Sequence, residues 1–110
     1  MNIRPGGLSW SVLMAVHRRR GNAYGVTIRD EVSDRNGRDV SYGAIYTTLQ
    51  RLEADGLLSS QEGESTPERG GRAKRFYELT GRGVTALETA SADIIRQLEG
   101  IGVPVGAGAK

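Results

Sequence analysis

The 110-residue chain has no cysteine, one histidine and three prolines. Without cysteine, disulfide bonds, thiol nucleophiles and cysteine zinc sites are excluded. A single histidine leaves few other ways to hold a metal, so we expect neither a metal nor another cofactor. No apolar run reaches the roughly 18 to 20 residues that span a bilayer, and the N-terminal sequence MNIRPGGLSW lacks the regions of a signal peptide. We therefore predict a cytoplasmic protein without a membrane partner.

Catalytic side chains are also scarce. Neighbouring carboxylates occur at Asp30 and Glu31 and at Glu62 and Glu64, but no cysteine or phosphate-binding glycine loop accompanies them to complete a nucleophilic or phosphate site. Charged surface explains them, so we predict that the protein is not an enzyme and has no catalytic residues. The 37% hydrophobic and 25% charged fractions are ordinary for one soluble domain, and composition alone therefore names no function.

The stretch from Ser41 to Leu58 carries the strongest pattern in the chain. Three apolar residues recur at intervals of three and four and share one narrow arc of a helical wheel: Ile45, Leu49 and Leu52. They predict a helix of about four turns with one buried face, capped by Ser41 and stopped by Gly56. The opposite arc has no acidic residue and suits a polyanion; it consists of Gly43, Thr47, Gln50 and Arg51, flanked by Tyr46.

Two shorter helices are expected before this one. The first, from Leu8 to Val16, has one apolar stripe for the core and a second stripe formed by Trp10, Leu13, Met14 and His17. This second stripe either makes the helix central in the core or meets a partner subunit, and we favour the partner, with His17 as a polar edge residue. The second helix is expected from Ala23 to Val32, followed by a turn at 33–38 and a short bridging strand at 39–40.

The period changes after Gly56. Two short extended segments, 57–62 and 74–79, flank a connector that contains glycine, serine and proline, which predicts a hairpin with a long tip. Basic residues gather at the tip and at the root of the returning strand: Arg69, Arg72, Lys74 and Arg75. Another basic cluster, Arg18–Arg20, follows the first helix, so the net charge of only +2 conceals local positive patches. The hairpin tip is either merely solvated or contacts phosphates and the minor groove.

The last helix has Thr80 as its expected N-cap. Its apolar positions alternate by three and four, as in the seam of a coiled coil: Val84, Leu87, Ser91, Ile94, Leu98 and Ile101. Together with the spare stripe of the first helix, this seam predicts a homodimer. Beyond Gly100 the sequence has helix breakers and no pattern, so we expect residues 102–110 to form a disordered tail.

Helix, helix, helix and hairpin is the order of a winged helix-turn-helix. We therefore predict a mainly α fold with a small β-hairpin, in which residues 1–79 form a winged helix-turn-helix DNA-binding domain and residues 80–101 a C-terminal dimerisation helix. The alternative is a winged-helix module that binds protein without specific DNA binding.

A set of short motifs in this order resembles the PadR family of transcriptional regulators. They are Tyr24-Gly25, Ser41-Tyr42-Gly43-Ala44-Ile45-Tyr46, Leu49, Arg51-Leu52-Glu53, Gly56-Leu57, Gly71-Arg72, Arg75-Phe76-Tyr77 and Leu79-Thr80 followed by Gly83. The resemblance implies a dimeric winged helix-turn-helix repressor of the smaller subgroup with one C-terminal helix, and in several members a small aromatic or drug-like effector relieves repression. The family often has threonine in place of Ala44 and proline in place of Thr47, so its base preference does not transfer.

The predicted DNA-binding residues are Tyr24, Ser41, Tyr42, Gly43, Ala44, Tyr46, Thr47, Gln50, Arg51, Arg72, Lys74 and Arg75. Within this set the tyrosines of the long helix donate hydrogen bonds to phosphates, while Thr47, Gln50 and Arg51 reach base edges of an inverted-repeat operator. Tyr42 is alternatively buried in the core, and Arg51 alternatively pairs with Asp55. The basic wing residues add a salt-dependent attraction that does not depend on base sequence.

The predicted dimer interface combines the two spare apolar surfaces: Trp10, Leu13, Met14, His17, Val84, Leu87, Ser91, Ile94, Leu98 and Ile101. Trp10 has two interpretations within it. It either holds the dimer together, which we favour, or lines an effector pocket in which a small aromatic ligand stacks on the indole.

Overall fold

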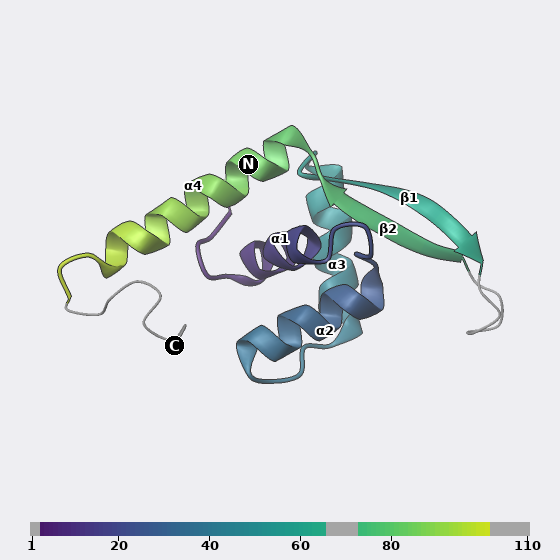
Figure 1. The fold of residues 1–110 in the computed structure, drawn as a ribbon, viewed down its shortest axis with the longest axis horizontal. Coiled ribbons are helices and arrows are strands. Elements are labelled where there is room, and N and C mark those ends of the chain that lie inside the picture. The colour runs from purple at the N-terminus through teal and green to yellow at the C-terminus, as the bar shows by residue number, and fades with distance from the viewer. Residues whose placement is uncertain (1–2, 66–72, 102–110) are drawn as a thin grey trace.

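Three helices and a hairpin precede a long fourth helix, as Figure 1 shows for residues 3–65 and 73–101, the part of the chain that the computed structural model describes. The elements in order are α1 (Leu8–Arg18), α2 (Gly25–Asn36), α3 (Tyr42–Ala54), β1 (Leu58–Ser65), β2 (Ala73–Leu79) and α4 (Gly81–Leu98). The predicted mainly α fold with a small hairpin is therefore confirmed. Arg69, Arg72 and the tail predicted at 102–110 lie outside the described residues.

Aliphatic side chains from α1, α2 and α3 form one core. The apolar arc predicted for the central helix is confirmed, because Ile45, Leu49 and Leu52 are fully buried. The same core contains Val12, Leu13, Val16, Ile28 and Val32. Burying one such side chain contributes about 1.5–3 kcal/mol, so the orientation of α3 is set by the side chains on its inner face.

Both ends of α3 follow the predicted signals. The Ser41 Oγ accepts a hydrogen bond from the Ala44 N–H at 3.1 Å. Gly56 has a φ of +81°, in the left-handed region that favours glycine at a helix stop. The helix itself ends at Ala54, so residues 55–58 of the predicted stretch form a turn and the start of β1.

The end of α2 differs from the prediction. The turn predicted at 33–38 is wrong, because α2 covers most of it. The bridging strand predicted at 39–40 is also wrong, and side chains of α2 take the backbone groups there. The Val40 N–H donates to the Ser33 Oγ at 3.0 Å, and the Val40 carbonyl accepts from the Arg29 Nε at 2.9 Å.

The predicted hairpin is confirmed. β1 and β2 pair in antiparallel fashion with Leu58 opposite Leu79, and β1 runs further toward the tip than predicted. A further backbone hydrogen bond joins this wing to the helices, since the Tyr77 N–H donates to the Ala23 carbonyl at 2.8 Å. The root of the wing is therefore held against the segment that leads into α2.

The cap predicted for the last helix is confirmed as well. The Thr80 Oγ1 accepts from the Gly83 N–H at 3.0 Å and donates to the Gly56 carbonyl at 2.6 Å. From this start α4 runs beside α1 and extends past the other helices (Figure 1). It ends at Leu98, so Ile101, the last member of the predicted seam, lies outside the helix. None of the helices in the described ranges is long and apolar enough to cross a membrane.

Gly83 packs directly against the backbone that precedes β1. A Cβ at this position would come within 3.0 Å of the Leu57 carbonyl carbon and closer still to its oxygen. We expect Gly83→Ala to lower the free energy of unfolding by roughly 1–3 kcal/mol in urea denaturation, as overpacking does elsewhere. Gly81→Ala is the matched control and should be neutral or stabilising, because no atom lies within 4 Å of a Cβ there. Equal losses in both variants would contradict the packing argument.

Candidate nucleic-acid interface

The face of α3 that points away from the core is open to solvent. Tyr42 and Tyr46 are 42% and 46% exposed. The other exposed positions are Ser41, Gly43, Thr47, Gln50 and Arg51, with Ala44 half-buried beside them. No acidic residue occurs from Ser41 to Leu52. This face therefore presents hydroxyl, amide and guanidinium donors without local negative charge, a set suited to phosphates and base edges.

The two tyrosines form a short stack on this face. Tyr42 and Tyr46 lie one helical turn apart, with ring centroids separated by 6.4 Å and ring planes inclined by 25°. The guanidinium of Arg29, on α2, lies 5.2 Å from the centroid of the Tyr42 ring. Tyr42 is thus a surface residue, and the alternative of a ring buried in the core does not hold.

Arg51 is directed toward α1. Its Nη2 donates a hydrogen bond to the Ser9 Oγ at 3.3 Å. The ion pairs found in the described ranges do not include one between Arg51 and Asp55, so the predicted alternative partner is replaced by Ser9. The guanidinium therefore occupies the α1 side of the exposed face.

The first half of β2 lies close to the start of α2. Lys74 Nζ lies 4.4 Å from the centroid of the Tyr24 ring, and the same ring meets Phe76 edge-on at 5.4 Å and 65°. Side chains alternate along β2, so Arg75 points to the other face of the hairpin. There it donates to the Ser60 Oγ at 3.0 Å, and that hydroxyl donates to a carboxylate of α3 at 2.7 Å. Lys74 therefore lies on the face of the hairpin next to Tyr24, and Arg75 on the face next to Ser60 and the end of α3.

Residues 12–89 match the transcriptional regulator PadR-like family. The chain belongs to this family. The transcriptional regulator Rv3488 of Mycobacterium tuberculosis is 42% identical over 71 residues, which cover 64% of this chain and 62% of that protein. The structure of a PadR-like transcription factor from Bacteroides fragilis matches 84% of both chains at 29% identity, with a TM-score of 0.71. That of a PadR family regulator from Eggerthella lenta matches 83% of this chain and 77% of its own at 24% identity, with a TM-score of 0.64.

The PadR-like membership confirms two further predictions. The proteins of the family are transcriptional regulators and not enzymes, and the matching structures confirm the winged-helix fold. Within residues 3–65 and 73–101, no group of three or more histidine, aspartate or glutamate side chains is arranged to hold a metal ion.

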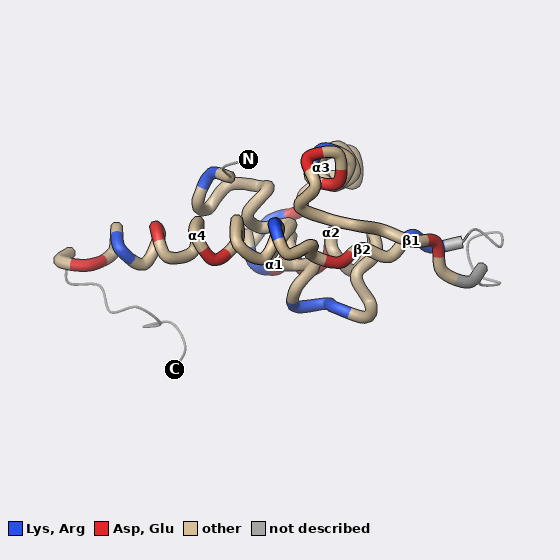
Figure 2. Tube along the Cα trace, turned by 90° about the horizontal axis from the view of Figure 1, so that it is seen from above, with Lys and Arg blue, Asp and Glu red and all other residues tan. Residues whose placement is uncertain are grey.

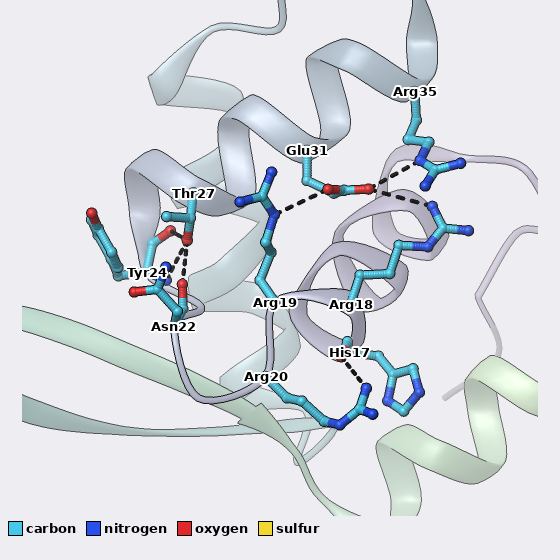
Figure 3. Close-up of polar contacts among 9 residues, drawn as sticks. All are labelled: His17, Arg18, Arg19, Arg20, Asn22, Tyr24, Thr27, Glu31 and Arg35. Atoms are coloured by element: carbon cyan, nitrogen blue, oxygen red, sulfur yellow. Dashed lines mark hydrogen bonds and ion pairs between the residues drawn. The ribbon is translucent and has the colours of Figure 1, made fainter.

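In this PadR-like regulator two of the three arginines at the end of α1 pair with α2, while Arg20 donates to the His17 carbonyl at 3.0 Å. Glu31 of α2 accepts hydrogen bonds from Arg18, Arg19 and Arg35 at 3.4, 3.0 and 3.0 Å (Figure 3). Its side chain is only 12% exposed. That burial opposes the charge, but the three hydrogen bonds together outweigh it and lower the pKa of the Glu31 carboxyl. The arginine-rich turn lies on the side of the molecule away from α3 (Figure 2), so it adds no donor to the α3 face.

The spare stripe predicted on α1 is divided between the core and the surface. Trp10 is half-buried, and its Nε1 donates to the Ser91 Oγ at 3.1 Å, which joins α1 to α4 within the chain. Leu13 is fully buried, so it packs in the core of one chain and offers no surface to a partner. Met14 is half-buried and His17 exposed.

A cavity of about 220 Å³ lies beside Trp10, between α1 and α2. Its wall combines the apolar side chains of Trp10 and Met14 with the charged groups of Arg18, Glu31 and Arg35. The Trp10 indole therefore borders this cavity and also donates a hydrogen bond to α4.

Part of α4 exposes apolar side chains. Val84 and Ile95 are 41% and 47% exposed, while Ile94 and Leu98 are half-buried. Leu87 is buried against the helices of its own chain. The predicted seam is therefore partly buried within the chain itself, and Ile95, which the predicted seam did not include, is exposed beside it.

Three residues near the α3 face were not foreseen from the sequence: Ser9, Gly25 and Arg29. Ser9 holds Arg51, Arg29 lies on Tyr42, and Gly25 is covered by the Tyr46 ring. No periodicity connects these positions, because they belong to α1 and α2 and reach α3 only through the tertiary fold.

Proposed function

We propose that this PadR-like regulator is a sequence-specific repressor that binds duplex DNA as a homodimer, with α3 in the major groove and the wing along the backbone. The observation that carries the proposal is the two-sided character of α3. One face is fully buried, while the exposed positions from Ser41 to Arg51 offer donors and include no acidic residue. The one acidic residue of the helix, Glu53 in its last turn, accepts a hydrogen bond from the Ser60 hydroxyl. A helix about 10–12 Å across fits the major groove of B-DNA, which is about 12 Å wide.

Two kinds of contact follow from the positions on α3. Tyr42 and Tyr46 donate to phosphates beside the groove, and Thr47 and Gln50 reach base edges, where a glutamine side chain bonds adenine N6 and N7. Arg51 exchanges its exposed bond to Ser9 for a base or phosphate at little cost. Small groups at the start of the helix allow close approach to the duplex: Ser41, Gly43 and Ala44.

The wing adds contacts that do not depend on base sequence. Lys74 is stacked on Tyr24 beside the start of α2, and both side chains face the same stretch of DNA backbone in this arrangement. Arg72 and Arg75 are proposed to contribute further positive charge. Each phosphate neutralised by such a residue releases counterions, so binding weakens as salt rises.

The proposed dimer forms through α4 and the outer surface of α1. Its centre is the apolar surface of Val84, Ile94, Ile95 and Leu98, whose exposure is unusual for side chains of this kind in a small soluble protein. Around it lie Trp10, Met14, His17, Ser91 and Ile101, whereas Leu87, like Leu13, is buried in its own chain. A twofold dimer places two copies of α3 on one duplex, which is why we propose an inverted-repeat operator.

An effector site is proposed at Trp10. The cavity beside the indole has apolar walls on one side and arginines on the other, which suits a small planar aromatic compound. Binding there would act on the joint between α1 and α4, and hence on the dimer that holds the operator.

Selection from a pool of random-sequence duplexes tests DNA recognition. We expect enrichment of an inverted repeat with half-sites about one helical turn apart. Gln50→Ala should then relax the preference at one position of each half-site, since a bidentate base contact contributes roughly 1–3 kcal/mol of discrimination. Lys74→Ala should weaken binding to all duplexes and reduce the slope of log K against log salt by about one per half-site.

Arg96→Ala serves as the control for charge, because Arg96 lies on α4 and pairs with Asp93. It should change neither the base preference nor the salt slope. Failure to enrich any sequence, with weak binding that disappears as salt rises, would instead favour the winged-helix module that binds protein.

The proposed dimer predicts a sensitive position on α4. Ile95→Glu places a charge in the centre of the proposed interface and should shift the protein from dimer to monomer in sedimentation analysis, with the fold retained. Thr89→Glu is the control, because Thr89 is also exposed on α4 but lies on another side of the helix. A dimer that survives Ile95→Glu unchanged would rule out this surface.

The effector proposal is tested by emission from Trp10, the only tryptophan in the sequence. Titration with a chemically broad panel of planar aromatic compounds should produce at least one saturable change in emission that Met14→Glu abolishes. The same compound should release the selected duplex. A panel without any saturable change would count against a sensor at Trp10.

A further inference from the structure

We infer that Gly25 and Arg29 of α2 are positioning residues for DNA recognition, which hold the phenol rings of Tyr46 and Tyr42 in the orientation that meets the phosphates. The inference rests on the proposed function. In it Gly25 and Arg29 contact the tyrosine rings, and only the tyrosines contact the DNA. Both pairs are spaced by four residues on their helices, so Gly25 faces Tyr46 and Arg29 faces Tyr42, one turn apart on each helix.

The first pair is a close approach of a ring to a backbone. A Cβ at position 25 would come within 2.7 Å of the Tyr46 Cζ and closer still to the phenol oxygen. Gly25 is helical and has no positive φ, so the phenol end of Tyr46, and not the backbone conformation, is what a side chain at position 25 would meet. Any larger residue here would displace the hydroxyl of Tyr46 from the first turn of α2.

The second pair is a cation held over a ring. The Arg29 side chain is fixed by the hydrogen bond from Nε to the Val40 carbonyl at 2.9 Å, and its Nη atoms lie 3.6 and 3.8 Å from carboxylates of Asp30 and Asp39. These contacts hold the guanidinium 5.2 Å from the centroid of the Tyr42 ring, within the range of a cation–π interaction. A lysine would keep the charge but lose the Nε hydrogen bond to the Val40 carbonyl that holds the cation over the ring.

The two pairs act together because Tyr42 and Tyr46 stack on each other. A side chain that is ordered before binding does not lose its rotational freedom on the DNA, and this advantage appears directly in affinity. More than two fifths of the surface of each tyrosine is exposed, so without the contacts to α2 the side chains would be free to change rotamer. The surface of α2 thus supplies the order that α3 alone does not provide.

A double-mutant cycle on the selected duplex tests this role. We expect Gly25→Ala to weaken binding about tenfold or more, as Tyr46→Ala does, and the double variant to bind no worse than Tyr46→Ala alone. Thermal unfolding without DNA gives a second readout, in which Tyr46→Ala should restore part of the midpoint lost in Gly25→Ala. Gly81→Ala, where a Cβ meets no atom within 4 Å, is the control and should leave affinity unchanged.

The second pair is tested in the same way. Arg29→Lys should weaken binding by about two- to fivefold while the salt slope stays the same, because the charge is kept and the anchored contact with the Tyr42 ring is lost. Tyr42→Ala should remove this effect of Arg29→Lys. Arg96→Lys is the matched control on α4 and should have no effect.

The outcomes separate this inference from the proposed function. If the wild-type protein selects a duplex but the paired losses of affinity are additive, Gly25 and Arg29 do not act through the tyrosines and the inference is overturned. If the wild-type protein selects no duplex, the proposed function fails first. Recovery of the unfolding midpoint in the Gly25→Ala, Tyr46→Ala double variant would then support the contact between ring and backbone alone.

Discussion

The turn at Gly56 and Leu57 joins the end of α3 to both the hairpin and α4. The Leu57 N–H donates to the Leu52 carbonyl at 2.9 Å, and the Leu57 carbonyl accepts from the Thr80 N–H at 3.1 Å. The Thr80 hydroxyl bonds the Gly56 carbonyl at 2.6 Å, and the side chain of Leu57 is buried. Because these bonds converge on Gly56, Leu57 and Thr80, the direction of α3, the root of the wing and the start of α4 are set at one point.

The electrostatic potential at the exposed face of α3 depends more on where the charged residues lie than on the net charge of the chain. Arg18, Arg19 and Arg35 share the carboxylate of Glu31, so this pairing reduces their contribution to the field at α3. The exposed donors of α3 are mostly neutral hydroxyl and amide groups. Recognition by this face would therefore depend on geometry, which makes the order of its tyrosines important.

Much of the fold could be predicted because its elements carry strong local signals. The arc of Ile45, Leu49 and Leu52 and the caps at Ser41 and Thr80 predict α3 and the start of α4, and the structure confirms them. Periodicity identifies which residues share a face but not what covers that face. For this reason it could not separate Leu13, which is buried in its own chain, from Trp10 and Met14, nor show that α4 turns part of its seam inward.

The turn and the strand predicted before α3 were wrong because side chains of α2 form hydrogen bonds with backbone groups several residues further along the chain. Ser33 and Arg29 take the backbone groups of Val40, so the chain before α3 needs no strand partner and α2 can continue into the predicted turn. The contacts of Arg29 with Tyr42 and of Gly25 with Tyr46 likewise appear only when α2 and α3 cross. The DNA-binding roles of the exposed residues remain predictions.

The hydrogen bonds between Thr80 and the turn at Gly56 and Leu57 also fix the start of α4 relative to the end of α3. At about 1.5 Å per residue, the 18 residues of α4 span roughly 27 Å, and its first turn is bonded to the segment that ends α3. α4 and α3 therefore move together. In the proposed dimer, a change of about 10° in the angle between the two α4 helices would move the two copies of α3 by several ångströms relative to each other. The spacing between the two recognition helices, and with it the choice between an operator and random DNA, would be adjustable from the far end of the molecule.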